Sequence, residues 1–192
     1  MIERAIAGLQ IAIDGPSGSG KGTIAKQVAD RIGLPVLDTG LLYRFSAWRA
    51  FEDGVPLDDV DGLLAMLRIA VETMEWRAGG VVFFAGKDCT SSLRGEDVGA
   101  AASTVAAIPL LRAELLQLQR KLAQAGCVMD GRDIGSVVLP EAQAKFFLTA
   151  SRRERARRRW QQLKDGPHEA SLQEIDADLQ ARDARDAERD VA

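Results

Sequence analysis

The sequence has very few residues of the kinds that form disulfides or bind transition metals. It contains two cysteines, Cys89 and Cys127, and one histidine, His168, in 192 residues. Two cysteines cannot build a disulfide framework, and with a single histidine they argue against a zinc site. A chain of this length buries enough of its own surface to fold without such a staple.

Long apolar runs and an excess of basic charge are absent as well. No stretch approaches the roughly 18 apolar residues of a membrane span, and the first ten residues include Glu3 and Arg4. We therefore expect no membrane partner, no secretory signal and a cytoplasmic location. The net charge of −3 also leads us to expect no nucleic-acid partner. Nothing in the sequence addresses oligomeric state directly, and a monomer is our expectation.

Apolar residues make up 46% of the chain and charged residues 28%, which is the balance of a globular protein. At roughly 150 residues per domain, the length corresponds to about one domain. Short apolar runs alternate with segments of helical periodicity, and these runs are Leu9–Ile13, Pro35–Leu37, Cys127–Asp130 and Lys145–Leu148. The alternation predicts an α/β fold with a doubly wound parallel sheet that helices cover on both faces.

One segment, at about 60–105, breaks this alternation. Within it, Thr73–Arg77 and Val81–Ala85 flank Ala78-Gly79-Gly80, which is the pattern of a β-hairpin. We interpret the segment as a small subdomain inserted into the parallel fold.

Glycine dominates the segment that follows the first apolar run. Gly15-x-x-x-x-Gly20-Lys21 is the core of a P-loop, and it stands between a predicted strand and a predicted helix, as that motif requires. Backbone N–H groups and the positive end of the helix would bind phosphate, and Lys21 would bring a charge to the outer phosphates. Gly22 occupies the usual hydroxyl position, so Thr23 is the candidate Mg²⁺ ligand. The predicted nucleotide-binding residues, to which the family resemblance described below assigns ATP, are Gly15, Pro16, Ser17, Gly18, Ser19, Gly20, Lys21, Gly22 and Thr23.

Arginines stand near glycines and acids in several places along the chain. They include Arg44, Arg112, Arg132, Arg182, Arg185, Arg189 and the run from Arg152 to Arg159. Phosphoryl transfer requires two anionic reactants to be aligned and their charge neutralised, and guanidinium groups suit that task. A P-loop with several arginines therefore favours a small-molecule kinase. A nucleotide-binding switch, or an RNA partner for the arginine run, is the alternative from another class, although the chain has no Asn-Lys-x-Asp tetrapeptide.

Six segments of the sequence together resemble bacterial cytidylate kinases. They are GPSGSGKGT (Gly15–Thr23), LDTGLLYR (Leu37–Arg44), Val98–Arg112, DGRDIGSVVLP (Asp130–Pro140), FFLTAS (Phe146–Ser151) and RDARD (Arg182–Asp186). The similarity extends from about Ile11 to the last residue. Many nucleoside monophosphate kinases share the P-loop, whereas LDTGLLYR and DGRDIG are specific to the cytidylate branch.

The resemblance implies a single P-loop kinase domain over residues 1–192. It implies that about 60–105 is an acceptor-binding subdomain and that about 151–170 is a short helical lid. The family also continues with one more strand and helix, which this sequence does not contain. The implied reaction moves the γ-phosphoryl group of ATP to CMP or dCMP with Mg²⁺, and a UMP or AMP acceptor is the nearest alternative.

Residue roles follow from the same resemblance. The implied catalytic residues are Lys21, Asp130, Arg132 and the lid arginines Arg155, Arg158 and Arg159. Asp130 would orient Mg²⁺ through a bound water, with Thr23 near the ion. The implied acceptor-binding residues are Thr39, Arg44 and Arg132 for the phosphate, Ser103, Arg112 and Asp133 for the cytosine, and Asp186 and Arg189 for the ribose and phosphate.

Overall fold

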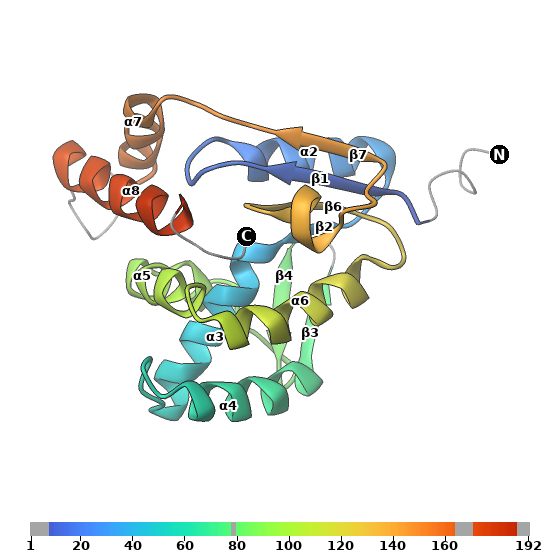
Figure 1. The fold of residues 1–192 in the computed structure, drawn as a ribbon, viewed down its shortest axis with the longest axis vertical. Coiled ribbons are helices and arrows are strands. Elements are labelled where there is room, and N and C mark those ends of the chain that lie inside the picture. Colours follow the sequence, from blue (N-terminus) through green and yellow to red (C-terminus); the bar gives the residue numbers. More distant parts are fainter. Residues whose placement is uncertain (1–7, 78–79, 164–170, 188–192) are drawn as a thin grey trace.

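A parallel sheet of four strands forms the centre of the computed structural model, which describes residues 8–77, 80–163 and 171–187 (Figure 1). The strands follow the order β2-β6-β1-β7, and each pair of neighbours is parallel. Their bounds are β1 (Gln10–Asp14), β2 (Val36–Asp38), β6 (Cys127–Gly131) and β7 (Ala144–Phe147). The predicted parallel α/β sheet is confirmed, and the four apolar runs are its strands.

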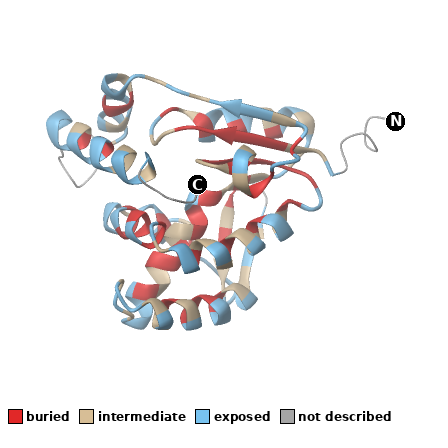
Figure 2. Cartoon of the chain, in the orientation of Figure 1, coloured by how far each residue is buried: buried red, intermediate tan, exposed pale blue. Residues whose placement is uncertain are grey.

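Helices cover both faces of this sheet. On one face, Ala25 and Ala29 of α2 (Lys21–Ile32) pack against Ile11 and Ile13 of β1. The opposite face buries Ala12 together with residues of α6 (Pro109–Ala123) and of the helical turn η2 (Ile134–Val138). Strands β1 and β6 are buried on both faces of the sheet (Figure 2). Because successive side chains of a strand point to opposite faces, such strands form continuous apolar runs in the sequence. The η2 turn is not evident from sequence periodicity.

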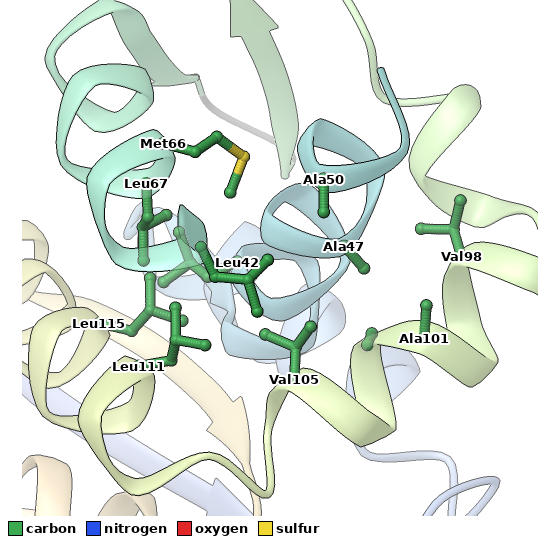
Figure 3. Packing of buried hydrophobic residues seen from close by; sticks show 12 residues of the cluster. Leu42, Ala47, Ala50, Met66, Leu67, Val98, Ala101, Val105, Leu111 and Leu115 are labelled. Carbon is green, nitrogen blue, oxygen red and sulfur yellow. The ribbon is translucent and has the colours of Figure 1, made fainter. Parts of the chain in front are cut away.

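A second apolar cluster lies among the helices below the sheet. It joins α3 (Thr39–Asp53), α4 (Val60–Thr73), α5 (Glu96–Val105) and α6 through side chains that include Leu42, Leu67, Val105 and Leu111 (Figure 3). Its packing fixes α3 and α5, which carry several of the predicted acceptor residues. In the described part of the chain no single helix is long and apolar enough to cross a membrane, and α5 and α6 meet that test only together, with a 102° bend between them.

The segment interpreted as an insertion contains a separate antiparallel sheet. Strands β3 (Met74–Arg77), β4 (Val81–Phe84) and β5 (Lys87–Asp88) form it, and the short helix η1 (Ser92–Arg94) follows. The pairing of Met74 with Phe84 confirms the predicted hairpin, although residues 78–79 of its turn lie outside the described residues. The indole N–H of Trp76 donates to the Val36 carbonyl at 3.3 Å, so this sheet is attached to the β2 edge of the parallel sheet.

Two helices near the end of the chain pack against each other. They are α7 (Arg152–Leu163) and α8 (Leu172–Ala187), and Ala156, Ile175 and Leu179 form their shared apolar contact. A capping box begins α8, because the Ser171 N–H donates to Glu174 at 2.8 Å and the Glu174 N–H donates to the Ser171 hydroxyl at 3.2 Å. The part of the predicted lid from 164 to 170 lies outside the described residues.

Candidate active site

The P-loop connects the end of β1 to the start of α2 by way of left-handed glycines. Gly18 and Gly20 have φ angles of 74° and 96°. A Cβ on Gly15 would lie 2.0 Å from the Leu148 carbonyl oxygen, so only glycine fits where the loop crosses the end of β7. In the described part of the chain, no side chain caps the start of α2. Its first N–H groups are therefore available to a phosphate, with the positive end of the helix dipole behind them.

Lys21 and Asp130 are two buried charges where the P-loop meets the end of β6. The Lys21 ammonium donates to the Pro16 carbonyl at 3.2 Å, and burial, followed by the nearby Arg132, lowers its pKa to about 8. Burial, followed by repulsion from Asp38, raises the pKa of Asp130 to about 7. The protein therefore destabilises the charged form of each group relative to water. Such destabilisation is typical of a site that binds a charged ligand.

Two buried oxygen atoms near the loop, Asp130 Oδ1 and Ser19 Oγ, have no hydrogen-bond partner among the residues that the structure describes. A buried polar atom without a partner is costly, so such atoms mark places where a ligand or ion binds. Mg²⁺ is commonly held by one or two carboxylates together with water and substrate phosphates, and Asp130 fits that description. No group of three or more acidic, cysteine or histidine residues forms a metal site among the described residues. The remaining ligands would therefore come from the nucleotide and water.

The Thr23 hydroxyl, predicted to lie near Mg²⁺, is less well placed to hold the ion than the Asp130 carboxylate. A Cβ built on Gly22 would lie 3.8 Å from Asp130 Oδ2, so position 22 is the one that faces the acid. Thr23, the next residue on α2, is exposed. Asp130 is therefore the stronger of the two candidates for holding the ion through water.

Asp14, at the end of β1, is a positioning residue that sequence reasoning missed. Its two carboxylate oxygens accept from the N–H groups of Ile134 at 2.7 Å and Gly135 at 2.8 Å. These bonds attach the loop after β6, which carries Arg132 and Asp133, to the strand that leads into the P-loop. The available signal was an acid directly before the first glycine of the P-loop.

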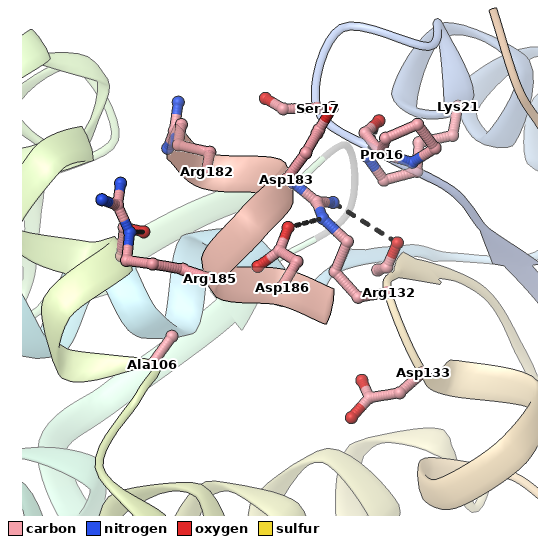
Figure 4. Close-up of polar contacts among 12 residues, drawn as sticks. Pro16, Ser17, Lys21, Ala106, Arg132, Asp133, Arg182, Asp183, Arg185 and Asp186 are labelled. Atoms are coloured by element: carbon pink, nitrogen blue, oxygen red, sulfur yellow. Dashed lines mark hydrogen bonds and ion pairs between the residues drawn. The ribbon is translucent and has the colours of Figure 1, made fainter. Parts of the chain in front are cut away.

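Several of the predicted acceptor residues are joined by ion pairs, and Figure 4 shows Arg132 beside Asp186 of α8. Arg132 forms an ion pair with Asp186 at 2.8 Å, and Arg112 forms one with Asp133. The hydroxyl of Thr39 donates to the Asp130 carbonyl. Arg44 donates to the carbonyls of Leu93 and Gly95. The Ser103 hydroxyl accepts from Arg185. Arg189 lies outside the described residues.

Several of these guanidinium groups lie close enough to repel one another. Burial lowers the pKa of Arg44, and the charge of Arg159 lowers it further. Burial also lowers the pKa of Arg182, with further contributions from Arg44 and Arg132. Arg182 donates to the Gly99 carbonyl at 3.2 Å and was not among the predicted site residues, although it belongs to the RDARD segment. An anion placed among these groups would relieve their repulsion.

The predicted lid arginines are held by other parts of the protein. Arg155 and Arg158 donate to the carbonyls of Ser17 at 3.0 Å and Ser19 at 3.1 Å, both in the P-loop. Arg159 instead forms an ion pair with Glu96 at the start of α5. Helix α7 therefore contacts both the P-loop and the acceptor side.

A protein-family model described as cytidylate kinase matches residues 11–192. The chain belongs to the cytidylate kinase family. A cytidylate kinase from Desulfitobacterium hafniense (strain Y51) is 46% identical over 185 residues, which are 96% of this chain and 80% of that protein. Another from Chromobacterium violaceum is 48% identical over 183 residues, covering 95% of this chain and 81% of that protein.

Membership of the cytidylate kinase family confirms the resemblance found in the sequence, including its start near Ile11. The solved structure of TT1252 from Thermus thermophilus covers 94% of this chain and 85% of that chain, at 20% identity and a TM-score of 0.42. The roles of single residues stay predictions.

Proposed function

We propose that this chain transfers the γ-phosphoryl group of ATP to CMP or dCMP. The chain belongs to the cytidylate kinase family. The observation that carries the proposal is the pair of buried charges, Lys21 and Asp130, which lies where the P-loop meets the acceptor-side arginines. In this proposal, about 60–105 is the acceptor-binding subdomain and about 151–170 is the lid. Helix α7, which touches both sides, belongs to that lid.

On the donor side, residues 15–23 would surround the phosphates of ATP. Lys21 would exchange the Pro16 carbonyl for a phosphate oxygen, and the phosphate charge would favour its protonated form. Asp130 would hold Mg²⁺ through a water. The bound ion would neutralise charge on the phosphates.

On the acceptor side, the arginine cluster would bind the phosphate of CMP. Arg44, Arg132 and Arg182 come from α3, the loop after β6 and α8, so they can surround an anion from three directions. The charges of Arg44 and Arg132 both lower the pKa of Arg182, so an anion bound among the three would favour its charged form. Holding both anionic reactants in line would supply most of the catalysis that this reaction needs.

The Arg112–Asp133 pair matches the hydrogen-bonding edge of cytosine. Cytosine presents two acceptors, O2 and N3, and one donor, the N4 amino group. A guanidinium supplies only donors, and a carboxylate is an acceptor that suits the N4 group. Uracil has the opposite polarity at positions 3 and 4, so it would face the wrong partner at both atoms.

The acceptor is tested by steady-state kinetics with a panel of nucleotides. We expect kcat/KM for CMP and dCMP to exceed that for UMP and AMP by at least about tenfold, because the pair discriminates by ~1–3 kcal/mol per base contact. A preference for AMP would contradict the assignment of the base site. Micromolar RNA binding at physiological salt, without CMP phosphorylation, would favour the alternative from another class.

The base-reading pair is tested by replacing Arg112 or Asp133 with alanine. We expect the CMP/UMP ratio of kcat/KM to fall by about 10- to 100-fold, because a base site left half paired no longer rejects the wrong base. Arg120→Ala is the matched control. Arg120 also lies on α6 and donates to the same region, the carbonyls of Val137 and Val138, so it tests the attachment of the helix alone. Unchanged selectivity in both alanine variants would move the base site elsewhere.

A further inference from the structure

Four charged residues near the end of helix α8 share one broad face because of their spacing. They are Arg182, Asp183, Arg185 and Asp186. Three of them contact the acceptor side: Arg182 bonds to the Gly99 carbonyl, Arg185 donates to the Ser103 hydroxyl at 3.0 Å, and Asp186 pairs with Arg132. The position of α8 therefore determines where several acceptor groups lie.

Asp183, the fourth residue, connects α8 to the donor side instead. Its two oxygens accept from the two terminal nitrogens of Arg155 at 3.0 and 2.5 Å, a bidentate pair of the kind that fixes orientation. Arg155 is only 5% exposed, and its other bonds go to the carbonyls of Ala150 and Ser17. The P-loop also packs closely on it, since a Cβ on Gly18 would lie 3.2 Å from the Arg155 Cβ. Figure 4 shows Asp183 beside Ser17.

We propose that Asp183 is a positioning residue that couples the P-loop to the acceptor arginines through Arg155. The inference rests on the proposed function and adds that nucleotide in the P-loop raises the affinity for CMP. A phosphate in the loop reorganises its backbone, and the Ser17 carbonyl transmits that change to the Arg155 guanidinium, which donates four hydrogen bonds. Arg155 then sets the position of α8 through Asp183. By thermodynamic linkage, CMP raises the affinity for the donor nucleotide by the same factor.

A second ion pair between α7 and α8 provides the matched control. Arg152 pairs with Asp176 at 3.0 Å, but Arg152 is exposed and Asp176 half-buried, and neither has a bond to the P-loop among the described residues. The apolar contact of Ala156 with Ile175 and Leu179 holds the two helices together in variants of either pair. Removing Asp176 therefore tests helix packing, and removing Asp183 tests coupling.

The experiment is calorimetric titration of the full chain with CMP, with and without a saturating non-hydrolysable ATP analogue and Mg²⁺. We expect the analogue to tighten CMP binding by about 5- to 150-fold in the unmodified chain, which is the usual range of coupling between sites. In Asp183→Ala this factor should fall to within about twofold of one, with the affinity for the analogue alone changed by less than about threefold. Asp176→Ala should keep the factor of the unmodified chain.

Two further measurements separate coupling from a general loss of structure. Asp183→Asn keeps the shape and one acceptor oxygen, so its coupling factor should be intermediate even where the alanine variant is poorly folded. At saturating ATP, Asp183→Ala should raise the KM for CMP more than it lowers kcat. A merely structural defect would reduce the active fraction, and so kcat, without raising KM.

Three results would overturn the inference: equal coupling in Asp183→Ala and the unmodified chain, equal loss in Asp176→Ala, or no coupling in the unmodified chain. Any of these with intact CMP phosphorylation leaves the proposed function standing. A chain that neither binds nor phosphorylates CMP refutes both.

Discussion

Replacing Lys21 with alanine is expected to reduce kcat by at least about 100-fold, since loss of one preorganised charge at the transferring group commonly costs that much. Lys21 is buried at the start of α2, and its ammonium donates to the Pro16 carbonyl, which a nucleotide would displace. Burial lowers its pKa to about 8, so folding gains little from the charge. The loss should therefore appear in turnover rather than in stability.

The measurement is a coupled assay at saturating ATP and CMP, together with thermal unfolding of the same preparations. Lys26→Ala is the matched control, because Lys26 lies on the same helix and is exposed. Its kcat should stay within about twofold of that of the unmodified chain, as is usual for an exposed side chain far from a buried contact. If Lys21→Ala keeps the turnover of the unmodified chain, Lys21 has no catalytic role.

Replacing Asp130 with asparagine is expected to stabilise the free protein and to inactivate it. Burial and the neighbouring Asp38 raise the pKa of Asp130 from 3.8 to about 7, so the native state favours the protonated acid and the unfolded state the carboxylate. The unmodified chain therefore loses stability as the pH rises from about 4 to about 7. Asparagine resembles the protonated acid and avoids this loss. At ~1.4 kcal/mol per pKa unit, the variant should gain up to about 4 kcal/mol above pH 7.

Denaturant unfolding across this pH range tests the stability of Asp130→Asn, and Mg²⁺ titration of the kinase activity tests its function. We expect the stability difference to be absent near pH 4, to grow through the interval and to be constant above about pH 7. The activity should fall at least about tenfold and require more Mg²⁺, because an amide is a poorer partner for a metal-bound water. Asp58→Asn, which alters an exposed carboxylate, should change neither property. A pH-independent stability difference would show that Asp130 does not titrate as described.

The contrast between free and bound states links these two predictions. Lys21 and Asp130 are buried, and Arg44 and Arg182 are half-buried, each at an electrostatic cost. Natural proteins accept such costs mainly where a ligand or a reaction offsets them. Stability and activity should therefore change in opposite directions at Asp130.

Sequence reasoning located the elements and the P-loop accurately because both depend on neighbouring residues. A strand of the parallel sheet reads as a short apolar run, and a helix reads as a periodic one. The glycines at 15, 18 and 20 indicate the loop because its backbone conformation and its close approach to β7 exclude side chains. The hairpin of β3 and β4 was predictable for the same local reason.

The sequence could not predict which partner each charged residue would choose. Asp14 holds N–H groups 120 and 121 residues away, and Arg155 donates to a carbonyl 138 residues away while pairing with Asp183. The run from Arg152 to Arg159 offers many guanidinium groups with similar local surroundings, so no local rule distinguishes Arg155 from Arg157, which pairs with Glu154 on its own helix.

The sequence by itself determined the strands and helices, the phosphate-binding loop and the family, because local periodicity, glycine spacing and motif identity are properties of contiguous residues. Only the tertiary structure decided which arginines lie close to one another, which carboxylate oxygen lacks a hydrogen-bond partner among the described residues, and which residue connects α8 to Arg155. These features depend on distances between segments that are remote in the chain. Packing of α3, α5, α7 and α8 around the sheet sets those distances, and local sequence patterns carry no information about them.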